Sequence, residues 1–143
     1  MNDPARIVIV DDDRAIRWVL ERALAQPDLD VTSFDRADTA LEAILSYPPE
    51  VLLTDIRMPG LDGLDLMAQV REACPDLPVI VMTAHSDLDS AVASYQGGAF
   101  EYLPKPFDVD DALALVRRAV AHARERASPV VVPEGFSADI IGE

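Results

Sequence analysis

The chain has 143 residues, half of them hydrophobic, and a formal net charge of −14. Its length predicts one compact domain with a short tail, and its hydrophobic content excludes a disordered chain. The acidic balance argues against direct nucleic-acid binding by this segment, because such binding depends on neutralising phosphates.

The composition also bears on where the protein works. No apolar run approaches the roughly 20 residues that a membrane-spanning helix needs. We expect no signal peptide, because the first residues lack a basic segment followed by an apolar one. The single cysteine cannot form an internal disulfide, which fits a reducing compartment. These features predict a cytoplasmic protein without membrane contact.

Five predicted strands alternate with amphipathic stretches along the chain. The apolar runs at 7–10 and 51–53 are short, branched and flanked by turn-forming residues, which predicts buried parallel strands. The stretches between the predicted strands carry apolar residues at helical spacing. In chain order we predict strand 6–10, a helix through residue 24, strand 31–34, helix 36–45, strand 51–54, a helix containing 64–73, strand 79–83, helix 86–96, strand 101–103 and a helix from 109 to about 126.

Individual residues refine the helix boundaries. Asp13 is favoured at the start of the first helix by the helix dipole, and Asp35 is predicted to cap the second helix. Gly60 and Gly63 are predicted to be structural, at a turn and at a helix entry. Trp18 lies off the apolar stripe of its helix, so we expect it to be partly exposed.

Repeated strand–helix units require right-handed crossovers and a mainly parallel sheet with helices on both faces. We therefore predict a doubly wound α/β fold. The chain changes character near its end, where residues 128–133 are punctuated by prolines and predict a linker. Residues 139–143 look like the opening of a further domain.

Charged side chains follow several predicted strands at the edge where ligands bind in open α/β sheets. Asp11 and Asp12 follow the first strand, Asp55 follows the third, and Lys105 stands between two prolines after the fifth. Carboxylates held together repel one another unless a cation joins them. Oxygen ligands without His or Cys suit Mg²⁺. A hard divalent ion beside a carboxylate and an ammonium is suited to handling a phosphoryl group.

Together with Thr83, these residues resemble the active-site set of two-component response regulator receiver domains. The resemblance covers about residues 5–126, and its local sequence is most similar to receivers of the nitrogen-regulator (NtrC) type. It implies a flavodoxin-like (βα)5 fold with a five-stranded parallel sheet in the order 2-1-3-4-5, a receiver domain at 1–126, and at 127–143 a linker with the truncated start of an AAA+ ATPase domain. The segments that carry it are residues 16–24, 54–60, 82–89 and 102–108.

The resemblance also implies roles for individual residues. Asp55 is the expected phosphoryl acceptor. Mg²⁺ is expected to bind Asp12, Asp55 and the backbone carbonyl of Arg57 directly, and Asp11 through a water molecule. Thr83 and Lys105 would contact the phosphoryl group, Thr83 and Tyr102 would form a conformational switch, and the Lys105–Pro106 peptide is expected to be cis.

The implied function is that of the phosphorylation-controlled receiver of a sigma-54-dependent transcriptional activator. Its expected partners are a sensor histidine kinase, the downstream ATPase domain and a second copy bound through the face between helices 86–96 and 109–126. We do not expect a dedicated turnover substrate. A second apolar stripe on the last helix is broader than one sheet contact requires, which suggests a partner surface. Its residues are Ala112, Leu115 and Ala119, beside a first stripe at Leu113, Val116 and Val120.

Two alternatives come from other classes. An aspartate-nucleophile phosphatase of the haloacid-dehalogenase type also uses Asp, Thr, Lys and Mg²⁺. However, Arg57 stands where such enzymes carry a second Asp as acid and base, and the chain has no insert to form a substrate cap. A stand-alone receiver, acting as a phosphate relay or adaptor, is the other alternative, and the linker counts against it.

Overall fold

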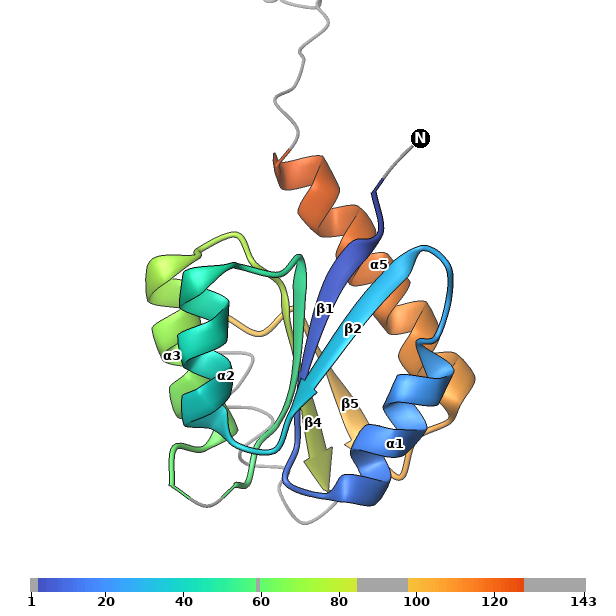
Figure 1. The fold of residues 1–143 in the computed structure, drawn as a ribbon, viewed down its shortest axis with the longest axis horizontal. Helices are drawn as coiled ribbons and strands as arrows, with labels where there is room; N and C mark the ends of the chain where they lie inside the picture. Colours follow the sequence, from blue (N-terminus) through green and yellow to red (C-terminus); the bar gives the residue numbers. More distant parts are fainter. Residues whose placement is uncertain (1–2, 59, 85–97, 128–143) are drawn as a thin grey trace, which may run out of the picture.

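The computed structural model describes residues 3–58, 60–84 and 98–127, which form a parallel sheet between two layers of helices (Figure 1). The sheet has five strands in the order β2-β1-β3-β4-β5, as predicted. The strands are β1 (Ala5–Val10), β2 (Leu29–Phe34), β3 (Val51–Asp55), β4 (Val79–Ala84) and β5 (Glu101–Lys105).

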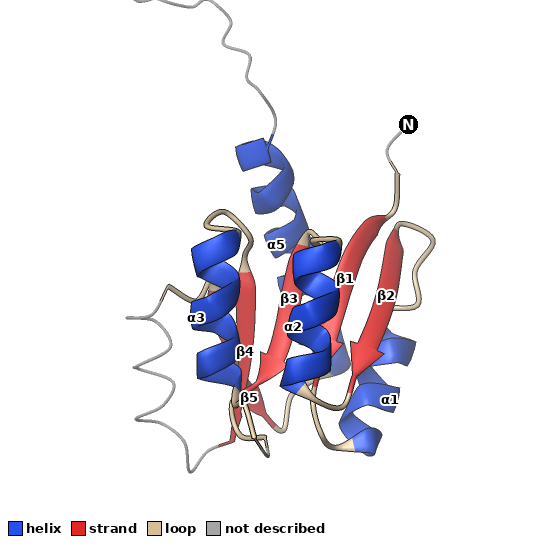
Figure 2. Cartoon of the chain, turned by 60° about the vertical axis from the view of Figure 1, so that its left-hand side comes forward, coloured by secondary structure: helices blue, strands red, loops and turns tan. Residues whose placement is uncertain are grey.

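Helices cover both faces of this sheet (Figure 2). One face carries α1 and α5, and the other carries α2 and α3. The helices are α1 (Arg14–Ala23), α2 (Ala37–Ser46), α3 (Gly63–Ala73) and α5 (Val109–Ala127). The helix predicted at 86–96 lies outside the described residues. No helix in the described part of the chain is long and apolar enough to cross a membrane.

The three central strands, β1, β3 and β4, are buried on both faces because each face has its own core. On β1, Ile7 and Ile9 pack toward α1 and α5, whereas Val8 and Val10 pack toward α2 and α3. Successive side chains of a strand point to opposite faces, so a strand covered on both sides needs a continuous apolar run. This packing confirms the interpretation of the apolar runs as buried parallel strands.

Of the two residues predicted at helix starts, Asp13 and Asp35, only the first is an N-cap in the structure. Asp13 caps α1 as its position suggested, and its carboxylate accepts a hydrogen bond from the Ala15 N–H. The prediction that Asp35 caps α2 is wrong. The N-cap is Arg36, which makes no side-chain capping bond. The carboxylate of Asp38, in the first turn, accepts the Thr39 N–H and pairs with Arg36 at 2.7 Å, so a residue inside the helix supplies the acceptor.

The interpretation of the broad apolar surface on α5 is also corrected by the structure. The second stripe, proposed above as a partner surface, is buried in the protein's own core. The helix packs against α1 as well as the sheet, and two neighbouring elements require a wider apolar surface than one. Ala112, Leu115, Val116 and Ala119 are buried, while Leu113 and Val120 pack against them partly buried.

Trp18 is 58% exposed on α1, as expected from its place off the stripe. The Arg22 guanidinium lies 5.0 Å from the centre of its ring. This contact covers part of the indole with a residue of the same helix, one turn further on.

The entry of α3 depends on Gly63, whose N–H donates to the Ile56 carbonyl at 2.8 Å. A Cβ atom at Gly63 would lie 1.8 Å from the backbone oxygen of Asp55. We expect Gly63→Ala to lower the free energy of unfolding by about 3 kcal/mol or more, since backbone must move to admit the methyl group. Urea denaturation followed by circular dichroism measures this change.

Gly60→Ala is the matched control. Gly60 has a φ of +78°, but no atom lies within 4 Å of its would-be Cβ. Only the left-handed backbone strain of about 1–2 kcal/mol should appear there. Equal losses in the two variants would contradict the close approach of α3 to Asp55.

Candidate functional site

The carboxyl ends of β1, β3 and β5 bring three charged side chains together. Asp11 directly follows β1, Asp55 ends β3, and Lys105 ends β5. Lys105 Nζ donates to Asp11 Oδ2 at 2.9 Å and to Asp55 Oδ1 at 3.2 Å. The two carboxylates are buried, with Asp11 0% and Asp55 9% exposed. The ammonium therefore joins two buried acids that come from neighbouring strands.

The backbone around Asp11 is held by local hydrogen bonds. Asp11 Oδ1 accepts the Asp13 N–H at 2.8 Å, and the Asp11 carbonyl accepts a bond from the Arg17 guanidinium at 2.6 Å. Both carboxylate oxygens of Asp11 are thus already engaged, one by the backbone and the other by Lys105. The Lys105–Pro106 peptide is cis, as predicted.

Asp12 adds a third carboxylate from the exposed side of the cluster. One carboxylate oxygen each from Asp11, Asp12 and Asp55 lie within 4.8 Å of one another. Oxygen donors of this kind, converging from a rigid sheet edge, fit a hard divalent cation. The structure therefore brings together the predicted acidic residues in an arrangement that can hold such an ion.

Burial of Asp55 raises the pKa of its carboxyl to about 6, and the neighbouring charge of Asp11 acts in the same direction. Lys105 opposes the increase without cancelling it. Burial works against the charged form of Lys105 as well, but its hydrogen bond to Asp11 and the two carboxylate charges outweigh it, so the Lys105 pKa is raised. The ammonium stays charged, while the acid pair retains an unbalanced negative charge.

Thr83 and Tyr102 lie on adjacent strands, as predicted. Tyr102 is in register with Val81 and packs beside it on the side of the sheet that α2 and α3 cover. Thr83 follows Val81 by two residues, so its side chain points to the same face. It is 3% exposed, and its hydroxyl donates to the Ala84 carbonyl at 2.9 Å rather than to the acidic cluster.

Several supporting residues were not singled out from the sequence. Thr54 is buried, and its hydroxyl donates to the Asp55 carbonyl at 3.0 Å. Asp62 caps α3 by accepting the Asp65 N–H at 2.9 Å. The signal for Asp62 was present, since an Asp stands three residues before another acid at the start of an apolar stretch. Thr54 gave no signal, because a threonine in a strand is ordinary.

The family of the chain follows from comparison with known proteins. Residues 7–117 match the model of the response regulator receiver domain. The chain belongs to this family, which decides against the phosphatase class. It is 59% identical over 136 residues to the DNA-binding transcriptional regulator NtrC of Escherichia coli strain K12, covering 94% of this chain and 29% of that protein. NtrC of Azospirillum brasilense is 42% identical, over 81% of this chain and 24% of its own length.

Solved structures agree with this assignment. The apo receiver domain of nitrogen regulatory protein C matches with a TM-score of 0.76 and 59% identity, over 82% of this chain and 95% of that one. The BeF3-activated form of that receiver matches with a TM-score of 0.73 and 58% identity, over 85% and 98%. The chain spans less than a third of the length of the curated relatives described above.

The acidic cluster predicts which carboxylates matter for metal binding. We expect Asp12→Asn to weaken Mg²⁺ binding by about tenfold or more, because one hard anionic ligand is lost. Asp13→Asn removes the same charge from the neighbouring residue, which caps α1 instead, and should bind Mg²⁺ nearly as the original chain does. Isothermal titration calorimetry measures both. Equal weakening would mean that overall charge, not coordination, governs binding.

The pKa of Asp55 predicts how the same affinity depends on pH. Its carboxyl titrates at about 6 in the ion-free protein, so above that pH it is ionised and available to a cation. Below it, the ion must displace a proton, and affinity should fall by up to about tenfold per pH unit. Titrations between pH 7.5 and about 5 test this, with Asp55→Asn as the control that should lose the pH dependence. An unchanged slope in that variant would assign the titration to another group.

Proposed function

We propose that this chain is a phosphorylation-controlled receiver whose Asp55 accepts a phosphoryl group from the phosphohistidine of a sensor kinase. The observation that carries the proposal is the bridge of Lys105 Nζ between Asp55 and Asp11, at 3.2 and 2.9 Å, beside the exposed carboxylate of Asp12. This arrangement combines a nucleophile, a cation and metal-binding oxygens at one sheet edge. Phosphoryl transfer is driven mainly by such positioning and charge neutralisation.

In the proposed step a carboxylate oxygen of Asp55 attacks the phosphorus atom. The P–N bond of the phosphohistidine breaks, and its electron pair remains on the imidazole nitrogen. The product is an acyl phosphate on Asp55. An ammonium has three donors, and Lys105 uses two of them on carboxylates, which leaves one for a phosphoryl oxygen.

Mg²⁺ is the ion that we propose for the cluster, where it would neutralise charge on the phosphoryl oxygens. Asp12, Asp55 and the backbone carbonyl of Arg57 would hold it directly. Asp11 would act through a water molecule, an assignment supported by the engagement of both its oxygens by Asp13 N–H and Lys105. The other ligand roles rest on the resemblance to receiver domains, since Asp55 is also partnered, through one oxygen, by Lys105.

We propose further that residues 1–126 form the receiver, and that 127–143 form a linker and the start of an AAA+ ATPase domain. The whole protein would then be a cytoplasmic, sigma-54-dependent activator of nitrogen-regulated genes, as its similarity to NtrC suggests. The receiver itself would have no dedicated turnover substrate. A stand-alone receiver, acting as a relay or adaptor, is the alternative, and the sequence that follows Glu143 in the full gene distinguishes the two.

Acceptor identity can be tested with acetyl phosphate and Mg²⁺. We expect intact-mass measurement to show one added phosphoryl group, and none when a chelator removes the ion before acetyl phosphate is added. Asp55→Asn should show none, whereas Asp13→Asn should still be modified, since Asp13 caps a helix. An adduct that maps to Asp11, Asp12 or Asp13 in the original chain would refute the assignment.

The phosphoryl group is proposed to act on the rest of the domain through Thr83 and Tyr102. Thr83 hydroxyl would leave the Ala84 carbonyl for an anionic phosphoryl oxygen, and Tyr102, on the same face of the sheet, would fill the space vacated. Reversing a 1:99 population takes about 5.5 kcal/mol, which a few charge-assisted hydrogen bonds can supply. We propose that the shift promotes dimerisation through the face between residues 86–96 and α5.

If this switch operates, a substitution at Thr83 should leave phosphorylation of Asp55 intact but weaken the self-association that follows it. Thr83→Ala should accept phosphate on Asp55 but couple it poorly to self-association, because the hydroxyl that responds to the phosphoryl group is gone. Thr83→Ser keeps the hydroxyl and should behave as the original chain does. Sedimentation velocity with and without acetyl phosphate measures the coupling. Identical phosphate-dependent dimerisation in the original chain and Thr83→Ala would exclude this route.

A further inference from the structure

Two adjoining hollows lie at the edge of the sheet where the strands begin, opposite the acidic cluster. The larger has a volume of about 310 Å³ and the smaller about 200 Å³. Residues 75–77 line both, so the hollows are neighbours, and the two together are here called the base groove. Its larger part is lined mainly by apolar and proline side chains: Pro48, Pro49, Cys74, Pro75, Leu77 and Ala123.

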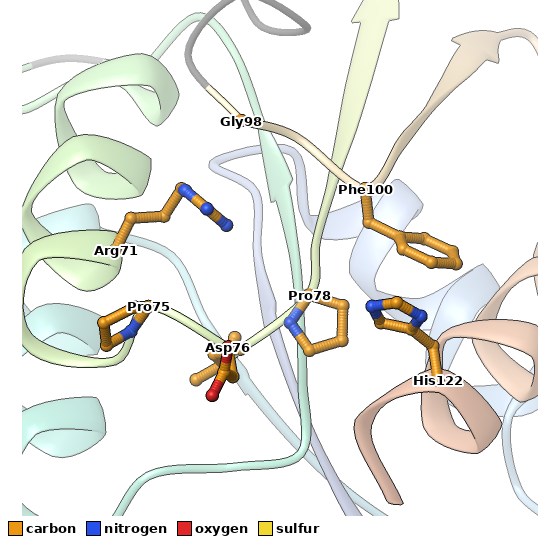
Figure 3. A pocket seen from close by; sticks show the side chains of 8 residues that line it. Arg71, Pro75, Asp76, Pro78, Gly98, Phe100 and His122 are labelled. Carbon is orange, nitrogen blue, oxygen red and sulfur yellow. The ribbon is translucent and has the colours of Figure 1, made fainter. Parts of the chain in front are cut away.

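The smaller part of the base groove contains a cation, Arg71, together with the carboxylate of Asp76. Arg71 enters it from α3, and His122 enters from α5 beside Phe100 (Figure 3). The rings of Phe100 and His122 lie 5.1 Å apart, so the wall on that side is aromatic. Within residues 3–58, 60–84 and 98–127, no hydrogen bond or ion pair engages the Arg71 guanidinium. In a chain of net charge −14, a partly buried cation of this kind favours an acidic ligand.

Two carboxylates in the lining limit what the base groove can bind. Glu50, paired with the Arg124 guanidinium at 2.6 Å, lines the larger hollow, and Asp76 lines both hollows. Among the residues that the structure describes, the lining of the larger hollow contains these two carboxylates and no cation, so an acidic group is disfavoured there, whereas the smaller hollow offers Arg71 beside Asp76. The base groove therefore suits a segment whose apolar residues fill the larger hollow and whose acidic residue, later in the segment, reaches Arg71 in the smaller one.

The chain itself continues with such a segment. Ala123 lines the larger hollow and stands one turn before the end of α5 at Ala127. Residues 129–133 read Pro-Val-Val-Val-Pro, and Glu134 follows. The two prolines restrict the backbone to extended conformations, which lowers the entropy lost on docking.

The distances allow this segment to return to the groove. From Ala127 back to Ala123 the helix rises about 6 Å. An extended chain gains about 3.3 Å per residue, so the valines can reach the larger hollow and Glu134 can lie up to about 23 Å from Ala127. We propose that residues 129–133 dock in the larger hollow of the base groove and that Glu134 pairs with Arg71 in the smaller one.

Docking would fix the direction in which the chain leaves the receiver. It would also bring Glu134 close to Gly98, because Gly98 and Arg71 line the same smaller hollow. A Cβ atom at Gly98 would lie 2.4 Å from Arg71 Nε, so the arginine lies directly against the backbone that leads into β5. A Glu134–Arg71 pair would thus contact both α3 and the approach to β5.

Cys74, half-buried in the larger hollow and the single cysteine of the chain, provides the probe. Its alkylation by iodoacetamide, a neutral reagent, is measured in the 143-residue chain. Replacing Val130, Val131 and Val132 together by Asp should raise the rate by roughly threefold or more, since a docked fraction of about two-thirds leaves the thiol open one-third of the time. The matched control replaces Ser137, Ile140 and Ile141 by Asp and should leave the rate unchanged. Equal rates in the original chain and the valine variant would overturn the proposal.

A charge exchange tests the second contact. Arg71→Glu should raise the alkylation rate, and adding Glu134→Arg to that variant should restore protection, because the pair is re-formed with its charges reversed. Failure of the double variant to regain protection would overturn the Glu134–Arg71 pairing. Protection that appears only as protein concentration rises would place the segment in the groove of a second copy and overturn docking within one chain.

Discussion

Two buried carboxylates from neighbouring strands repel each other, and the Lys105 ammonium is placed between them. Removing one member of such a buried charge group typically costs about 3–5 kcal/mol, because the charges left behind lose their partner. The ammonium reaches both acids from β5 across the end of the intervening strand β4. Strand order, and hence the parallel topology, is what makes this contact possible.

One cation does not neutralise all of the acids at this site. Burial, and after it the charge of Asp11, hold the pKa of Asp55 above its usual range although Lys105 lies beside it, and Asp12 adds a further carboxylate on the exposed side. A site with surplus negative charge attracts a divalent ion. Once an ion is bound, the same carboxylate oxygens are in place to meet a phosphoryl group. The charge imbalance thus connects the fold to the proposed phosphorylation.

The opposite edge of the sheet has a different character. There the lining is largely proline, aromatic and other apolar side chains, and Arg71 and Asp76 are the charged side chains of the smaller hollow (Figure 3). Because α5 runs from one edge to the other (Figure 1), its last turns reach this second depression, where Ala123 is part of the lining. Chemistry and chain exit are therefore separated by the length of the sheet.

Much of this arrangement could be predicted from the sequence. Parallel strands covered on both faces need unbroken apolar runs, and such runs mark the three central strands in the sequence. The acids at the ends of β1 and β3 and the lysine at the end of β5 were visible as well. The position of Asp13 as a cap and the exposure of Trp18 also followed from local pattern. These features depend on residues close together in the chain, or on the general rule that strand ends converge.

What only the tertiary structure decided involves contacts between distant segments. The α5 stripe of Ala112, Leu115 and Ala119 is buried because α1 lies beside the sheet there, and helix periodicity cannot show how many elements a helix touches. Asp35 is not the cap of α2, because Asp38 satisfies the first turn from within. Gly63 is required because α3 begins against the Asp55 carbonyl. The base groove, likewise, exists only where loops before β3 and β4 meet α5, since a cavity is a property of packing between segments that the sequence does not place side by side.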